Sequence, residues 1–133
     1  MCLMACAAIL VVGGCDSASS SGAVEKLRLA QENMESVSTE FADVLKEVVD
    51  EASAEAAKPK LNAISKKMVD AGKDLELAMN TKSRLAMGIK KKVNDFRREQ
   101  KVVVDDQVRR IKNLPSAKLI LDDILKKIST NPR

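Results

Sequence analysis

Apolar side chains recur every seven residues along residues 23–57, and this spacing constrains the fold more than any other feature of the chain. The repeat and the apolar positions interleaved with it are Leu27, Ala30, Met34, Val37, Phe41, Leu45, Val48 and Ala52. Spacings of three and four residues place these side chains on one face of a helix. Such a helix is not stable alone in water, so we expect it to pack against a partner.

The same spacing continues in a second helical segment, which we predict over residues 60–113. Its apolar positions include Leu61, Ile64, Met68, Ala71, Leu75, Leu85, Ile89, Val93, Phe96 and Ile111. Pro59 separates the two segments, because proline disfavours the helical conformation of Lys58 and fits the first turn of a new helix. We therefore expect the chain to reverse at Pro59.

Two further stretches contain residues that end helices. Residues 80–83 tolerate a turn, but Lys82 opposes the dipole of a helix starting there and no capping-box Glu follows. A continuous or kinked helix is therefore slightly favoured over a break. Pro115 marks a firmer break and predicts a last helix over residues 116–129.

The pattern as a whole predicts an all-α fold, either a long antiparallel helical hairpin or a small helical bundle with coiled-coil-like seams. The composition agrees, since the chain has no Trp or Tyr, only two Phe, and apolar residues that favour helices. We expect one helical domain over residues 23–133.

The first fourteen residues, MCLMACAAILVVGG, carry no charge. A helix that spans a bilayer needs about 20 apolar residues, so this run fits the apolar part of a signal peptide better. Val12-Gly13-Gly14-Cys15 places an aliphatic and two small residues before a cysteine, and it resembles the lipobox of bacterial lipoproteins. Small residues allow a membrane-embedded peptidase to approach the backbone that it cuts.

This resemblance covers residues 1–15 and implies cleavage between Gly14 and Cys15. Cys15 would then carry a diacylglycerol on its thiol, and often an acyl chain such as palmitate on its new amine. Gly13 is a less usual choice than Ala or Ser in this motif. No Lys or Arg precedes the apolar run, which suggests a translation start farther upstream.

Residues 15–22, CDSASSSG, would form the lipidated cysteine and a flexible polar tether that lets the domain clear the lipid headgroups. The lipobox and the tether together predict attachment to a membrane of the bacterial cell envelope, on its periplasmic or extracytoplasmic face. The alternatives are an uncleaved anchor and a buried core segment that begins at Met1.

Charge is distributed unevenly along the chain. Residues 16–57 hold three basic and ten acidic side chains, a net charge of −7, whereas residues 58–133 hold twenty basic and nine acidic ones, a net charge of +11. An acidic first helix paired antiparallel with a basic second helix would place opposite charges beside the apolar seam. Exposed pairs contribute about 0–1 kcal/mol each, so charge selects this pairing while burial stabilises it.

A group of basic residues in the second segment is the strongest sign of a partner after the lipobox: Lys90, Lys91, Lys92, Arg97, Arg98 and Lys101. A reversal at Pro59 would place residue 93 opposite Val24, so that this basic stripe would extend past the acidic helix toward the tether. The stripe could then bind an anionic lipid or cell-wall polymer. The alternative, which we favour, is a solvated face offset by the acidic helix. Nucleic acid is the least expected partner, because the predicted envelope location argues against it and the chain has only two aromatic residues for base stacking.

Catalytic and metal chemistry have little support in this sequence. The chain has no His, and its three cysteines stand at positions 2, 6 and 15, so residues 23–133 hold no imidazole, thiolate or disulfide. The acidic pairs at 105–106 and 122–123 could hold a cation, but neighbouring side chains on a helix point about 100° apart. We interpret them as solvated carboxylates and expect no enzyme activity, cofactor or metal.

The methionines offer one alternative function. Met34, Met68, Met79 and Met87 could line a groove for an apolar ligand, although methionines at helical spacing more often fill a core. The favoured hypothesis is a noncatalytic lipoprotein that acts as a structural or protein-interaction module, with an envelope protein or a second copy as partner. Binding of an anionic envelope component through the basic stripe, and carriage of an apolar ligand, are the rival hypotheses.

Overall fold

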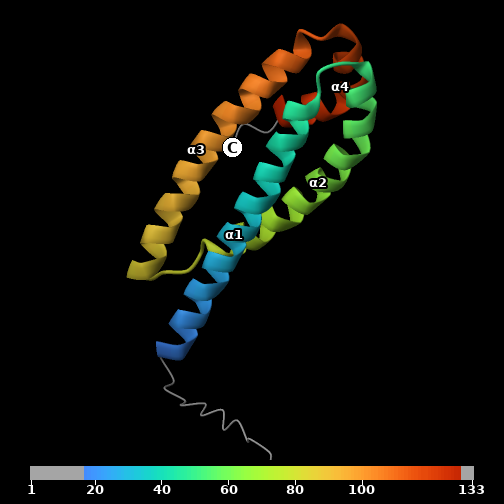
Figure 1. Cartoon of the computed structure of the whole chain (residues 1–133). Helices are drawn as coiled ribbons and strands as arrows, with labels where there is room; N and C mark the ends of the chain where they lie inside the picture. The colour runs from blue at the N-terminus through green and yellow to red at the C-terminus, as the bar shows by residue number, and fades with distance from the viewer. Residues whose placement is uncertain (1–16, 130–133) are drawn as a thin grey trace, which may run out of the picture.

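The computed structural model describes residues 17–129, which form four α-helices (Figure 1). They are α1 (Ser17–Glu47), α2 (Glu51–Ala78), α3 (Arg84–Lys112) and α4 (Pro115–Ser129). No strand occurs within these residues, so the all-α prediction is confirmed, and the helices form a small bundle rather than one long hairpin. The predicted signal segment at residues 1–14 and Cys15 lie outside the described residues.

The helices are arranged in a ring of neighbours. α1 packs against α2 and α3, and each of these two helices also packs against α4. The chain reverses between successive helices, so α3 runs parallel to α1, and Figure 1 shows α1 between the other two long helices. α4 has 15 residues and α3 has 29, so α4 covers only the part of the bundle near the end of α1.

Two clusters of buried side chains follow from this arrangement. The larger cluster joins all four helices, and we call this part of the molecule the four-helix end; among its members are Phe41, Leu45, Leu61, Ile111, Leu121 and Leu125. The smaller cluster consists of Leu27, Leu75, Ala86 and Val93, from α1, α2 and α3 only. We call this part, which lies near the start of α1, the three-helix end.

The first reversal of the chain corrects the prediction made from Pro59. α1 ends at Glu47 and α2 begins at Glu51, so the chain turns at residues 48–50. Asp50 caps α2, since its carboxylate accepts a hydrogen bond from the backbone N–H of Ser53 (2.8 Å). The hydroxyl of Ser53 in turn accepts one from the N–H of Asp50 (2.9 Å). This reciprocal capping box satisfies donors that a helix start otherwise leaves unpaired.

Pro59 lies inside α2 instead of starting a helix. A proline there removes one backbone hydrogen bond and costs about 3 kcal/mol in a helix interior. The helix nevertheless continues, because Ala54 and Ala57 before the proline and Leu61 and Ile64 after it are buried in the same core. Packing on both sides of Pro59 therefore overrides its local preference.

The other two connections divide the predicted second segment. α2 ends at Ala78 and α3 begins at Arg84, so residues 80–83 do break the helix and the continuous helix that we slightly favoured is wrong. The hydroxyl of Ser83 caps α3 by accepting from the N–H of Leu85 (3.2 Å). The break predicted at Pro115 is confirmed, and Pro115 is the first residue of α4, a position that suits proline because its missing N–H needs no partner there.

The Ser-rich stretch predicted as a flexible tether is helical from Ser17 onward. Once the packed part of α1 has nucleated a helix, each added residue costs little, so Ser and Ala can continue it toward the N-terminus. Asp16 is then the one residue between Cys15 and the start of α1.

Candidate functional site

The chain's candidate sites begin with Cys15, which lies outside the described residues together with the rest of the lipobox. Its predicted lipidation therefore stays a prediction. None of the helices in the described part is long and apolar enough to cross a membrane.

Three of the four carboxylates in the two acidic pairs form ion pairs with basic side chains along their own helices. Asp105 pairs with Lys101 (2.9 Å) and Asp106 with Arg109 (3.7 Å). Asp122 pairs with Lys126, and this hydrogen bond raises the pKa of that lysine. Across residues 17–129, no group of three or more acidic, His or Cys residues is arranged to hold a metal ion.

The methionines do not gather at one groove. Met34 and Met79 pack against the small cluster at the three-helix end, and Met68 packs against the large cluster at the four-helix end. Met87 is 67% exposed on the surface. Three of the four therefore help to fill the two cores, as methionine's flexible side chain suits it to do.

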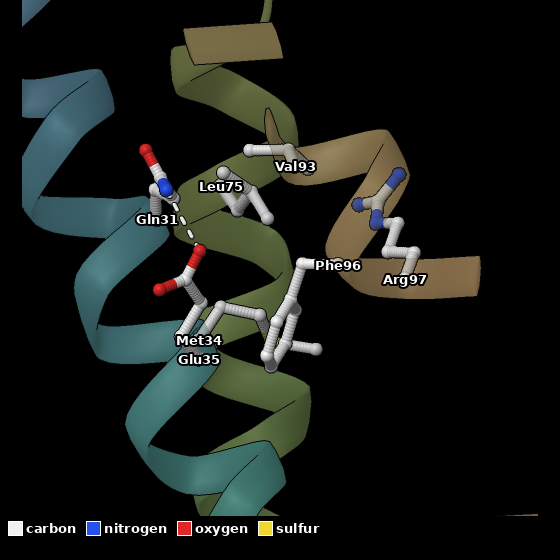
Figure 2. Close-up of a pocket in the computed structure, with 7 residues that line it drawn as sticks. All are labelled: Gln31, Met34, Glu35, Leu75, Val93, Phe96 and Arg97. Atoms are coloured by element: carbon white, nitrogen blue, oxygen red, sulfur yellow. Dashed lines mark hydrogen bonds between the residues drawn. The ribbon is translucent and has the colours of Figure 1, made fainter. Parts of the chain in front are cut away.

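A shallow hollow does occur between α1, α2 and α3 (Figure 2). Its wall is formed by Gln31, Met34, Glu35, Leu75, Val93, Phe96 and Arg97. Gln31 donates a hydrogen bond to Glu35 along α1 (2.7 Å), which leaves the apolar side chains to form the floor. The hollow has a volume of about 10 Å³, which is about the space of one water molecule, and is partly open to solvent, whereas pockets for drug-sized ligands measure about 300–1,000 Å³. It is too small to enclose such a ligand.

The six residues of the predicted basic stripe all lie on α3, but not in the predicted place. Because α3 runs parallel to α1, Arg97 lies at the same hollow as Gln31 and Glu35 of α1. The prediction that Arg97, Arg98 and Lys101 extend beyond the acidic helix is therefore wrong. It failed because the chain turns at two corners, at 48–50 and 79–83, instead of once at Pro59.

The stripe also divides into two parts by its partners. Arg98 pairs with Asp95 (4.0 Å) and Lys101 with Asp105 (2.9 Å), both within α3. Lys90, Lys91, Lys92 and Arg97 form no ion pair with any residue of the described part. The uncompensated positive charge is thus concentrated toward the start of α3.

Opposite charges do meet between α1 and α2. Lys60 lies 3.7 Å from Glu47, and Lys67 lies 3.8 Å from Glu40. The four side chains are each at least half exposed, so each pair contributes little to stability. The predicted pairing of an acidic with a basic helix is present in these two contacts, while burial carries the stability.

One residue between α1 and α3 was missed by the sequence analysis. The guanidinium of Arg110 donates hydrogen bonds to the backbone carbonyls of Leu45 (2.8 Å), Lys46 (3.3 Å) and Val48. The last carbonyls of a helix lack intrahelical partners and carry a partial negative charge, which a cation stabilises. Arg110 therefore joins α3 to the end of α1, and only the tertiary structure brings these residues together.

A second feature that the sequence analysis missed is the α2–α3 corner, formed by residues 77–92. Its apolar side chains Leu77, Leu85 and Met87 are 71%, 74% and 67% exposed. Residues 77–94 include five basic residues and no acidic one. A count of charged residues in a window centred on residue 85 finds this segment. The predicted basic stripe instead groups its lysines with Arg97, Arg98 and Lys101 farther along α3.

Comparisons with protein-family models, with curated proteins and with solved structures gave no match to this chain.

Proposed function

We propose that this chain is a noncatalytic lipoprotein of the bacterial cell envelope, anchored by lipid on Cys15, whose helical bundle acts as a structural or protein-interaction module. The observation that carries the proposal is the Val12-Gly13-Gly14-Cys15 motif after an uncharged apolar run. The absence of His from the chain and of Cys beyond Cys15 supports the noncatalytic part.

The position of α1 adds to the proposal. Because α1 begins at Ser17, one residue after Asp16, a lipid on Cys15 would hold the bundle within a few ångströms of the bilayer. α1 has 31 residues and is about 46 Å long at 1.5 Å per residue. The four-helix end would then project from the membrane, where it can meet an envelope protein or a second copy of the chain.

Fatty-acid labelling in a bacterial host tests this proposal. We expect a labelled mature protein that begins at Cys15, and loss of both label and cleavage in the Cys15→Ser variant. The Cys6→Ser variant is the matched control, because it removes a cysteine from the same segment but leaves the lipobox intact. Equal labelling of wild type and Cys15→Ser, or a mature protein that begins elsewhere, would refute the proposal.

A further inference from the structure

The α2–α3 corner combines exposed apolar and basic side chains. Three of the eight large hydrophobic residues that are exposed in the described part, Leu77, Leu85 and Met87, lie within residues 77–87. Lys82 and Arg84 stand between them in the sequence, and both are exposed. Apolar side chains flanked by lysine and arginine are the combination by which proteins lie in the interface of an anionic bilayer.

The positive charge of the corner is not neutralised within the bundle. Its five basic residues, Lys82, Arg84, Lys90, Lys91 and Lys92, form no ion pair with any other residue among 17–129. The nearest acidic residues in the sequence are Glu76 and Asp95, and Asp95 already pairs with Arg98. The corner therefore presents a local field of one sign to any surface that it faces.

The fold places this corner at the end of the bundle from which α1 starts. Val24 and Leu27 of α1 pack in one cluster with Ala78, Met79 and Ala86 of the corner. Leu27 is ten residues from the start of α1, about 15 Å along the helix. The four-helix end, which carries α4, lies at the opposite end of the bundle.

We infer that the α2–α3 corner is a second membrane contact, by which the bundle rests on a bilayer of anionic phospholipid. Leu77, Leu85 and Met87 enter the boundary between headgroups and acyl chains, while Lys82, Arg84 and the lysines at 90–92 lie among the lipid phosphates. The bundle brings this corner to the surface by leaning toward it, so that the first ten residues of α1 lie along the headgroup layer and not across it.

This inference rests on the proposed function only in that the lipid on Cys15 brings this end of the bundle to the membrane. The two or three acyl chains expected on Cys15 already give stable attachment, so the corner is not needed to hold the chain at the membrane. The second contact instead sets the orientation of the bundle relative to the bilayer, with the four-helix end pointing away from the lipid.

Single tryptophans introduced into the full chain test the contact, since the chain contains none of its own. Leu85→Trp reports on the corner, and Leu119→Trp on α4 is the matched control, because these leucines are 74% and 78% exposed and lie at opposite ends of the bundle. Each variant is incorporated into vesicles of phosphatidylglycerol and phosphatidylcholine with brominated acyl chains, which quench only tryptophans that reach the bilayer. We expect several-fold stronger quenching and a blue-shifted emission for Leu85→Trp, and neither for Leu119→Trp.

Charge reversal separates the corner from the rest of the basic stripe. Full-length Cys15→Ser chain that also carries Lys82→Glu and Arg84→Glu should partition about tenfold or more weakly onto phosphatidylglycerol vesicles than Cys15→Ser alone. Arg98→Glu with Lys101→Glu is the control and should change partitioning much less, because these residues are paired within α3. Salt at about 0.15 M should reduce the effect of the corner charges, since the Debye length falls to about 8 Å.

Several results would overturn the contact: equal quenching of the two tryptophans, equal effects of the two charge reversals, or a blue shift of Leu85→Trp that depends on protein concentration without lipid. The last would show that a second copy of the chain covers the corner. If Cys15 is labelled with fatty acid but the tryptophan of Leu85→Trp is not quenched, this inference alone is refuted. If that tryptophan is quenched but Cys15 is not labelled, the proposed function alone is refuted.

Discussion

The two ends of the bundle differ in how completely their helices are covered. Fifteen buried residues form one core at the four-helix end, whereas four form the core of the three-helix end. The difference arises because α4 is about half as long as α3 and covers one end only. A chain of this size thus concentrates its stability at one end and leaves apolar and basic side chains exposed near the other, where the proposed anchor lies.

The two corners also differ in how completely the neighbouring helix ends are capped. At residues 48–50, Asp50 and Ser53 cap the start of α2 reciprocally, and Arg110 donates hydrogen bonds to carbonyls at the end of α1. At residues 79–83, Ser83 alone caps α3 with a single hydrogen bond. Local opening is easiest where few apolar contacts hold the backbone, so we expect the α2–α3 corner to open at lower free energy than the four-helix end.

The largest expected effect compares one buried leucine from each end. Leu121 is fully buried and Leu75 is 1% exposed, so Leu121→Ala and Leu75→Ala remove the same group from cores of different size. We expect Leu121→Ala to lower the free energy of unfolding by about 3–4 kcal/mol and Leu75→Ala by about 2–3 kcal/mol, because the open end can partly collapse around the lost side chain. Urea unfolding measures both, and a larger loss for Leu75→Ala would contradict the comparison.

A smaller effect is expected from the contact between α3 and the end of α1. Arg110→Gln removes hydrogen bonds to the carbonyls of Leu45, Lys46 and Val48, and it should lower the free energy of unfolding by about 1–2 kcal/mol. Arg109→Gln is the control, since the side chain of Arg109 is 78% exposed and pairs only with Asp106 among the described residues. We expect the control to change stability by less than about 0.5 kcal/mol. Similar losses in both variants would show that the contact does not stabilise the four-helix end.

The smallest effect distinguishes the two caps. Asp50→Ala removes half of the reciprocal cap and should lower the midpoint of thermal unfolding by about 5 °C. Ser83→Ala removes the single cap and should lower it by less. Calorimetry of both variants at neutral pH measures the difference, and equal shifts would contradict the distinction between the corners.

The cap at Asp50 also predicts a pH dependence. Its hydrogen bonds with Ser53, the side-chain one first, lower the pKa of Asp50 below its ordinary value. The stabilisation from the ionised carboxylate is therefore fully present above the unfolded-state pKa near 3.9 and is lost as the pH falls through the lower folded-state pKa. The difference in the free energy of unfolding between wild type and Asp50→Ala should become smaller as the pH falls below about 4. A difference that stays constant down to pH 2 would show that the charge of Asp50 does not contribute to stability.

Much of the local structure could be predicted from the sequence. The apolar spacing identified residues that the structure buries, such as Leu27, Leu45, Leu61 and Ile111, and Pro115 marked the start of the last helix. The two wrong helix ends share one cause, because both were predicted from local propensity. Buried contacts on both sides of Pro59 keep α2 helical there. At residues 80–83 the chain breaks, and the helices on either side of the break both contribute to the smaller cluster.

The candidate sites were less accessible from the sequence. The basic residues of α3 could be identified, but their neighbours on α1 could not. Those neighbours depend on whether α3 runs parallel or antiparallel to α1, and one wrongly placed turn reverses that direction. The contact between Arg110 and α1 gave no signal, because its partners there are backbone carbonyls more than sixty residues away in the chain. The lipobox at Cys15 is a sequence motif, and it stays a prediction for labelling to test.

The sequence by itself determined that this chain is helical, which faces of its helices are apolar, and that acidic residues precede basic ones. These properties follow from the spacing and identity of neighbouring side chains, which act over one or two turns of a helix. The tertiary structure alone decided that α3 runs parallel to α1, that α4 covers one end, and that the exposed basic corner lies near the start of α1. Those outcomes depend on where the chain turns and on which apolar faces can be buried together, and both are properties of all four helices at once.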